Sequence, residues 1–267
     1  MARILQDESI RVVEEREEPL ILSIETATRA GSVAVSRGKA LLSYGTGDAS
    51  RSHSTDLLEL ISQALSEAGA GLGDVELFAV ALGPGSFTGL RIGVATVKGL
   101  ASTLERRVVG VPTLEALALA AGLGERVAAL LPAGRGELFA QSFRVEEPLK
   151  VSPLDKPAHV APQILLETYR GLRNVRWIGE GADAQREKIR AVADEERIAF
   201  IEESLEQARE QEGLWTLAKS PENLAVYVGL LAFERQQRGE TGRPEELQAI
   251  YVRPSDAELK EKCLTQG

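Results

Sequence analysis

The hairpin sequence IETATRAGS, residues 24–32, carries polar side chains that could contact a phosphate. An ATP-binding hairpin of this kind has an acidic residue and a glycine that lets phosphate approach the backbone. Here Glu25 supplies a longer carboxylate, and Ala27 adds a methyl group where the glycine is expected. Glu25, Thr26 and Thr28 are therefore the candidates for nucleotide binding, and the alternative is a tight turn capped by its own polar side chains.

A second stretch, GPGSFTGLRIG, follows an apolar run and leads into a helix from Ser86 to about Thr103. It lacks the GK[ST] ending of a P-loop, so no lysine is available for a phosphate. Gly89 and Gly93 are four residues apart, so they stack on one helix face and allow another backbone to approach closely. That face packs either against the sheet of the same chain or against a partner helix.

Metal and nucleophile chemistry have little support in this sequence. The two histidines, His53 and His159, are far apart, and the single cysteine, Cys263, rules out an internal disulfide. No HExxH pair or GxSxG elbow is present. We therefore predict no catalytic residue and no metal site. The turn around Gly136, flanked by Arg135 and Glu137, is either functional or an ordinary strand connection.

Composition limits the possible partners. The chain has 267 residues and a formal net charge of -9, which disfavours stand-alone nucleic-acid binding because phosphate contacts supply most of that affinity. No apolar run is long enough for a membrane span, and the first 19 residues have no signal-peptide core. One cysteine fits a reducing compartment, so a cytoplasmic protein is expected.

The order of expected elements indicates the fold class. Residues 20–123 read as β-β-β-α-β-α-β-α, which is the plan of a ribonuclease-H-like lobe with a mixed sheet. Residues 124–267 form a second, more divergent lobe with a tail, and a helix at about 220–238 packs back on the first lobe or stays with the second. Residues 1–19 are an extension in which SIRVVEE, residues 9–15, could form a short strand.

Several motifs together resemble the TsaB (YeaZ) family of bacterial tRNA threonylcarbamoyladenosine biosynthesis proteins. They are ILSIETATRAGSVAV, ALGPGSFTGLRIGVATVKGLA, GVPTLEALA, GRGELFAQSF and YVRPSDAELK. The resemblance implies an α/β protein with the actin-like (ASKHA) fold of two ribonuclease-H-like lobes and mixed β-sheets. Family members often have Asp at the position of Glu25, and an acidic and basic pair where this chain has Pro132, Ala133 and Gly134.

The resemblance also implies a function. It suggests a non-catalytic scaffold that binds and organises the catalytic subunit TsaD together with TsaE, forms a homodimer in isolation, and meets tRNA only through the complex. No cofactor is expected for the chain alone, although ATP could bind at the complex interface. The competing interpretations are a stand-alone ATPase, kinase or peptidase of the actin-like class, and a free-standing homodimer in cell-wall or proteostasis control.

The partner interface is predicted on two helices, from Ser54 to Ala68 and from Ser86 to about Thr103. The second helix is apolar all round, so a monomer is expected to leave the Gly89–Gly93 strip uncovered. The predicted interface residues are Leu57, Leu58, Ile61, Leu65, Phe87, Gly89, Leu90, Gly93 and Val97.

Overall fold

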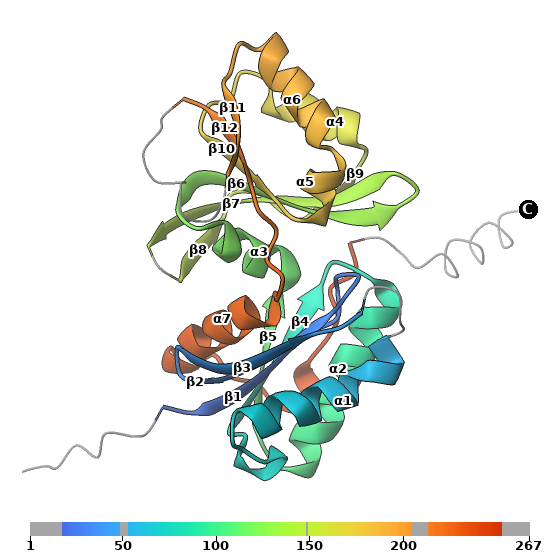
Figure 1. Ribbon diagram of the computed structural model, residues 1–267, viewed down its shortest axis with the longest axis vertical. Coiled ribbons are helices and arrows are strands. Elements are labelled where there is room, and N and C mark those ends of the chain that lie inside the picture. Colours follow the sequence, from blue (N-terminus) through green and yellow to red (C-terminus); the bar gives the residue numbers. More distant parts are fainter. Residues whose placement is uncertain (1–17, 49–52, 148, 204–212, 253–267) are drawn as a thin grey trace, which may run out of the picture.

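The computed structural model describes residues 18–48, 53–147, 149–203 and 213–252, which form two lobes (Figure 1). The first lobe holds a five-stranded sheet in the order β3-β2-β1-β4-β5. Its strands are β1 (Leu20–Glu25), β2 (Ser32–Arg37), β3 (Ala40–Thr46), β4 (Leu77–Gly83) and β5 (Arg107–Pro112). The first three are antiparallel and joined by tight turns, whereas β4 and β5 add in parallel after helical crossovers.

The second sheet repeats this plan. Its order is β11-β12-β10-β6-β7-β8, and β9 pairs with β7. The strands are β6 (Gly124–Gly134), β7 (Glu137–Glu147), β8 (Lys150–Pro153), β9 (Ala158–Val160), β10 (Val175–Ile178), β11 (Phe200–Glu203) and β12 (Trp215–Ala218). Three antiparallel strands followed by parallel additions occur in both sheets. The predicted actin-like fold of two ribonuclease-H-like lobes with mixed sheets is confirmed.

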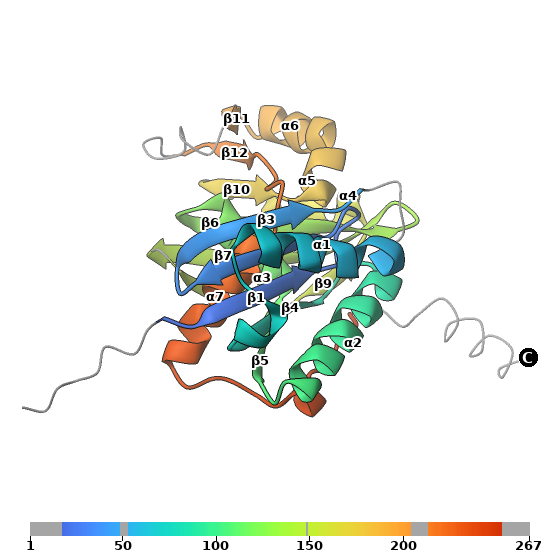
Figure 2. The ribbon, with the colours of Figure 1, turned by 60° about the horizontal axis from the view of Figure 1, so that its bottom comes forward.

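The helices are distributed over the faces of these sheets (Figures 1 and 2). Helices α1 (His53–Glu67) and α2 (Phe87–Thr103) cover the outer face of the first sheet, and α3 (Thr113–Ala121) and α7 (Ala225–Gln237) lie between the two sheets. Helices α4 (Pro162–Tyr169), α5 (Glu180–Ala184) and α6 (Arg186–Glu195) belong to the second lobe. The described residues also include two short 3₁₀ helices, Leu72–Asp74 and Pro244–Glu246.

The core is divided by the sheets into three clusters. One lies between the sheets around α3 and α7, one lies under α1 and α2, and one lies under α4 to α6 around Trp177 and Trp215. The chain returns from β12 to the first lobe through Asn223, whose Nδ2 donates to the carbonyls of Val33 (3.2 Å) and Gly45 (2.9 Å). Burial of these apolar surfaces and this return segment together fix the position of α7 on the first sheet.

Candidate functional site

The side chain of Glu25 is hydrogen-bonded within the β1–β2 hairpin that contains it. Glu25 is fully buried, and its Oε1 accepts a 2.6 Å hydrogen bond from the backbone N–H of Thr28. Its Oε2 accepts from the hydroxyls of Thr28 (2.7 Å) and Ser32 (3.3 Å). Burial raises the pKa of Glu25 above its usual range, although the hydrogen bonds from Thr28 and Ser32 act in the opposite direction. The side chain therefore closes its own turn, as in the polar-cap alternative.

The hairpin is packed tightly against the loop that begins α2. A Cβ added to Gly85 would lie 2.6 Å from both the Cβ and the carbonyl oxygen of Ala27, and Ser86 N–H donates to that oxygen at 2.8 Å. Thr26 Oγ1 donates to the carbonyl of Gly89 at 2.7 Å. Hairpin and loop therefore form one packed unit in which small residues are required by the close approach of two backbones.

The polar groups of this unit have hydrogen-bond partners within the chain. The space beside the hairpin is filled by the Gly85 loop, and the Thr28 N–H and hydroxyl are both directed to Glu25. Thr26 is buried and its hydroxyl is committed to α2. Two of the three predicted nucleotide ligands thus serve internal packing, and only Thr28 is half-exposed.

The prediction that the Gly89–Gly93 strip of α2 faces a partner is wrong. Gly89 and Gly93 are buried, and a Cβ on Gly93 would collide with Thr26 Oγ1, so this face packs on the hairpin of the same chain. Leu57, Ile61, Leu65 and Val97 are likewise buried in the core under α1 and α2, and Leu90 is buried as well. The helical period of the sequence predicts two apolar faces on α2 and does not show which of them is buried by the same chain. In the structure, the face with Gly89 and Gly93 is buried because it packs on the β1–β2 hairpin.

The outward side of the same two helices is a shallow groove. Its volume is about 320 Å³, and its lining residues are Leu58, Leu72, Ala95, Thr96, Gly99, Leu100, Thr103 and Leu104. Leu58, one of the predicted interface residues, is 64% exposed, and a Cβ added to Gly99 would meet nothing within 4 Å. Sequence reasoning missed Gly99. The signal was a row of small residues, Ala95, Gly99 and Thr103, with the same spacing of four as the buried row.

The N-terminal end of α2 carries an aromatic and cationic group. Ser86 caps the helix by accepting from Gly89 N–H at 3.2 Å. Phe87, half-exposed, lies 3.9 Å below the Arg91 guanidinium and 5.0 Å from the ring of Tyr251. The segment around Tyr251 is held there because Ile250 N–H donates to the Leu82 carbonyl at 2.7 Å. Phe87 therefore contacts both Arg91 and Tyr251 at the N-terminal end of α2.

The remaining described candidates lie in the β6–β7 turn and on the neighbouring strands β7 and β9. Arg135 lies in the two-residue turn between β6 and β7, where Gly134 pairs with Glu137, so this segment is a strand connection. His159 Nε2 lies 2.9 Å from Glu137 Oε2. Among the described residues no group of three or more His, Cys, Asp or Glu could hold a metal ion. Cys263 and the side chain of His53 lie outside the described residues.

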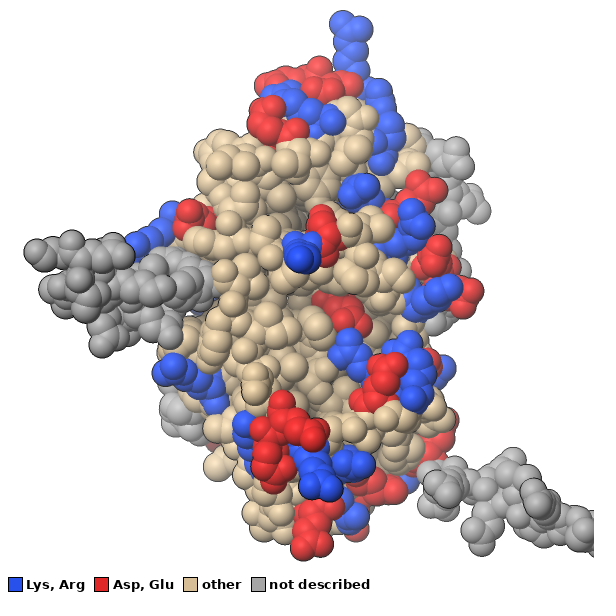
Figure 3. Space-filling view, turned by 180° about the vertical axis from the view of Figure 1, so that it is seen from behind, with Lys and Arg blue, Asp and Glu red and all other residues tan. Residues whose placement is uncertain are grey.

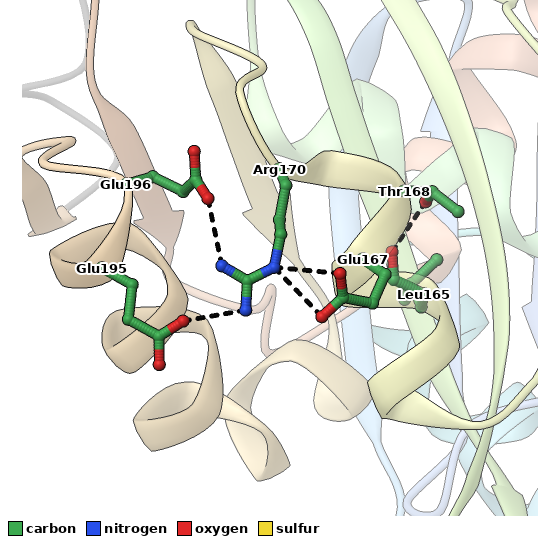
Figure 4. A network of polar contacts seen from close by, with 6 residues as sticks. All are labelled: Leu165, Glu167, Thr168, Arg170, Glu195 and Glu196. Atoms are coloured by element: carbon green, nitrogen blue, oxygen red, sulfur yellow. Dashed lines mark hydrogen bonds and ion pairs between the residues drawn. The ribbon is translucent and has the colours of Figure 1, made fainter.

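Charge on the surface is mixed. On the face seen from behind, Lys and Arg alternate with Asp and Glu along the margins, and the centre is largely uncharged (Figure 3). Arg170 is the centre of a dense cluster (Figure 4). Its Nε donates to Glu167 at 3.0 Å, Nη1 to Glu196 at 3.0 Å and Nη2 to Glu195 at 2.8 Å. These bonds raise the pKa of Arg170, Glu195 first, and the cluster joins α4 to α6.

The chain is similar to several known proteins. The family model of TsaD, the tRNA N6-adenosine threonylcarbamoyltransferase, matches residues 46–206. The chain is 33% identical over 173 residues to the tRNA threonylcarbamoyladenosine biosynthesis protein TsaB of Escherichia coli (strain K12), covering 62% of this chain and 72% of that protein. TsaB of Haemophilus influenzae is 35% identical over 123 residues, which is 45% of this chain and 51% of that protein. YeaZ from Pseudomonas aeruginosa superposes with a TM-score of 0.66 at 25% identity, covering 87% and 99% of the two chains.

Proposed function

Because the chain belongs to the TsaB (YeaZ) family and so takes part in threonylcarbamoyladenosine modification of tRNA, we propose that it is a non-catalytic subunit that binds and organises TsaD. The observation that carries this proposal is the outward groove of α1 and α2. It exposes apolar Leu58 beside the small residues Ala95 and Gly99, a combination that suits a partner helix.

The small residues set how closely a partner can approach. Ala95, Gly99 and Thr103 follow one another at intervals of four residues, so they lie along one side of α2. A helix without bulky side chains on that side allows another helix to pack backbone to backbone. Leu58 on α1 supplies apolar area at the edge of this contact, and Phe87 extends it at the N-terminal end of α2.

The same groove would serve two partners. In isolation, two copies of the chain pair through α1 and α2, and TsaD replaces one copy in the active complex. The partners share a family model that covers this region, so equivalent helix pairs can meet in both assemblies. TsaE joins the resulting pair rather than the isolated chain.

Substrate and nucleotide would reach this protein through the complex. With a net charge of -9, the isolated chain repels a polyanion, and a basic partner has to supply the phosphate contacts. The β1–β2 hairpin is packed against the Gly85 loop, so any ATP in the assembly would bind mainly with groups of the partner. A stand-alone ATPase, kinase or peptidase finds no support in these contacts.

A reconstitution experiment tests the proposal. TsaD, TsaE, substrate tRNA and a threonylcarbamoyl-adenylate donor are assayed for threonylcarbamoyladenosine with and without this chain, and binding to TsaD is followed by analytical ultracentrifugation. We expect a complex of defined stoichiometry and a strong loss of modification when the chain is omitted. Modification at full rate without the chain, or the absence of a complex with TsaD, would refute the proposal.

A further inference from the structure

A cavity between the two lobes has no part in the proposed scaffold role. Its volume is about 870 Å³, which lies within the usual range of small-molecule sites. It is bounded by the last turn of α3, the first half of α7 and the paired ends of β6 and β7, where Gly124 lies opposite Val145. At the other end of this ladder, Gly134 lies opposite Glu137. The cavity is therefore at the opposite end of β6 and β7 from the Gly136 turn, and the first sheet separates it from the groove of α1 and α2.

One buried cation lines the cavity. Arg176 of β10 is 9% exposed, and its Nη1 donates a 2.8 Å hydrogen bond to the Ala121 carbonyl at the end of α3. Gly122 follows with a φ of 80°, and a Cβ added there would lie 3.6 Å from Nη1, so the chain turns closely over the guanidinium. A guanidinium has five N–H donors in a planar fork that matches a carboxylate, and it stays charged at physiological pH. Arg176 therefore gives the inner part of the cavity a positive charge.

Tyr227 in the first turn of α7 supplies a second polar group to the same cavity. Its side chain is half-buried, and burial raises the pKa of the phenol above its usual range. The hydroxyl therefore stays protonated and can donate a hydrogen bond. Within the described part of the chain this hydroxyl has no hydrogen-bond partner. A half-buried phenol in such a position is suited to a polar group of a ligand.

The rest of the cavity combines apolar walls with an acidic edge. The apolar lining residues are Leu119, Ala120, Ala121, Leu123, Val145, Leu149 and Leu230. Three exposed carboxylates, those of Glu125, Glu146 and Glu147, also line it, and Arg144 lies 3.9 Å from Glu146. These exposed carboxylates repel a ligand with several negative charges, so phosphates and nucleotides are disfavoured. A single carboxylate, by contrast, can still pair with the buried Arg176.

We propose that this cavity binds a monocarboxylate with an aliphatic chain. The ligand carboxylate accepts hydrogen bonds from the guanidinium of Arg176 and the hydroxyl of Tyr227. The chain lies against the apolar walls, where it contacts Leu119, Val145 and Leu230. The cavity is lined by α3 and α7, which lie between the sheets, and by three strands of the second sheet. A bound ligand therefore holds the two lobes in this arrangement and stabilises the folded chain.

Calorimetric titration of the full chain with octanoate tests this site. Octanol and octyltrimethylammonium have the same chain without the negative charge, and each should bind at least about tenfold more weakly than octanoate. Nuclear magnetic resonance should show octanoate-induced shifts at the amides of Gly122 and Gly124, which line the cavity. Equal affinities for the three compounds would overturn the proposal, because Arg176 would then have no role in binding. Absence of saturable octanoate binding would overturn it too, as would shifts confined to residues outside the cavity.

Two variants test the shape and the polar group of the cavity separately. Leu230→Trp fills the space beside α7 and should weaken octanoate binding at least about tenfold. Ile164→Trp adds the same ring at a position that is 63% exposed on the second lobe, and this matched control should keep the wild-type affinity. Tyr227→Phe removes only the hydroxyl and should weaken octanoate binding about fivefold without affecting octyltrimethylammonium. Circular dichroism confirms the fold of each variant, and wild-type octanoate affinity in folded Leu230→Trp or in Tyr227→Phe would contradict the assigned site.

Discussion

Helix α2 has two rows of small residues that serve opposite purposes. On the inner side, Gly93 faces Thr26 and leaves no room for a Cβ, whereas on the outer side a Cβ on Gly99 would meet nothing. The inner row packs on the β1–β2 hairpin of the same chain. The outer row stays open beside Leu58. A glycine in a helix therefore indicates close approach, and only the surroundings tell whether the approaching chain is its own or a partner's.

The hairpin and the groove also differ in their polar side chains. Glu25 and Thr26 look like ligands in the sequence, yet both are buried and bound to their own backbone. The groove, by contrast, has few polar groups and no predicted chemistry. The proposed scaffold role therefore depends on the shape of the groove rather than on reactive groups.

Replacing Gly93 or Gly99 with leucine should give the largest difference in stability between the inner and outer rows of α2. Gly93→Leu forces side-chain atoms into the space of Thr26, and we expect the free energy of unfolding to fall by about 3 kcal/mol. Gly99→Leu relieves a helix glycine without a clash and should raise it by up to about 0.8 kcal/mol. Urea unfolding followed by circular dichroism measures both. Equal stabilities for the two variants would contradict the assigned inner and outer faces.

A charge placed in the groove should weaken partner binding without unfolding the protein. Leu58→Glu is expected to weaken TsaD binding at least about tenfold, equivalent to about 1.4 kcal/mol. Its effect on unfolding should stay within about 0.5 kcal/mol, because the side chain is 64% exposed. Ile164→Glu is the matched control, since Ile164 is 63% exposed on a helix of the second lobe. Calorimetric titration with TsaD should find wild-type affinity for the control; equal losses would remove the special role of the groove.

Replacing Glu25 should change the free energy of unfolding by a smaller amount, and the change should depend on pH. Its pKa in the folded protein is raised by burial above the ordinary 4.5, so the folded state binds the proton more tightly than the unfolded state. The stability contributed by Glu25 is then fully present below pH 4.5 and is lost as pH rises through the raised value. Relative to Glu25→Gln, the wild type should become more stable on acidification, by about 1.4 kcal/mol for each pKa unit. A stability difference that does not change with pH would show that the carboxylate is not desolvated.

The sequence predicted much of the first lobe because its signals are local. The alternation in residues 20–46 predicted the meander, and the Ser86 cap with its apolar run predicted α2. Which face of α2 is buried could not be predicted, because that depends on the hairpin about 60 residues earlier in the chain. The helices and strands between residues 145 and 215 were also poorly defined by the sequence. Their positions depend on long-range contacts such as those of Arg170 with α6.

The most direct test of the scaffold role combines groove and hairpin variants in the reconstituted tRNA modification reaction. With limiting amounts of this chain, the Leu58→Glu, Gly99→Arg double variant should fail to support TsaD, and a large excess of it should restore the rate, because only binding is weakened. Thr28→Ala, which alters the hairpin, should support modification at the wild-type rate. Full activity of the double variant at limiting concentration would contradict the account. So would a folded, TsaD-bound Thr28→Ala protein that supports no modification, because that result would place chemistry in the hairpin.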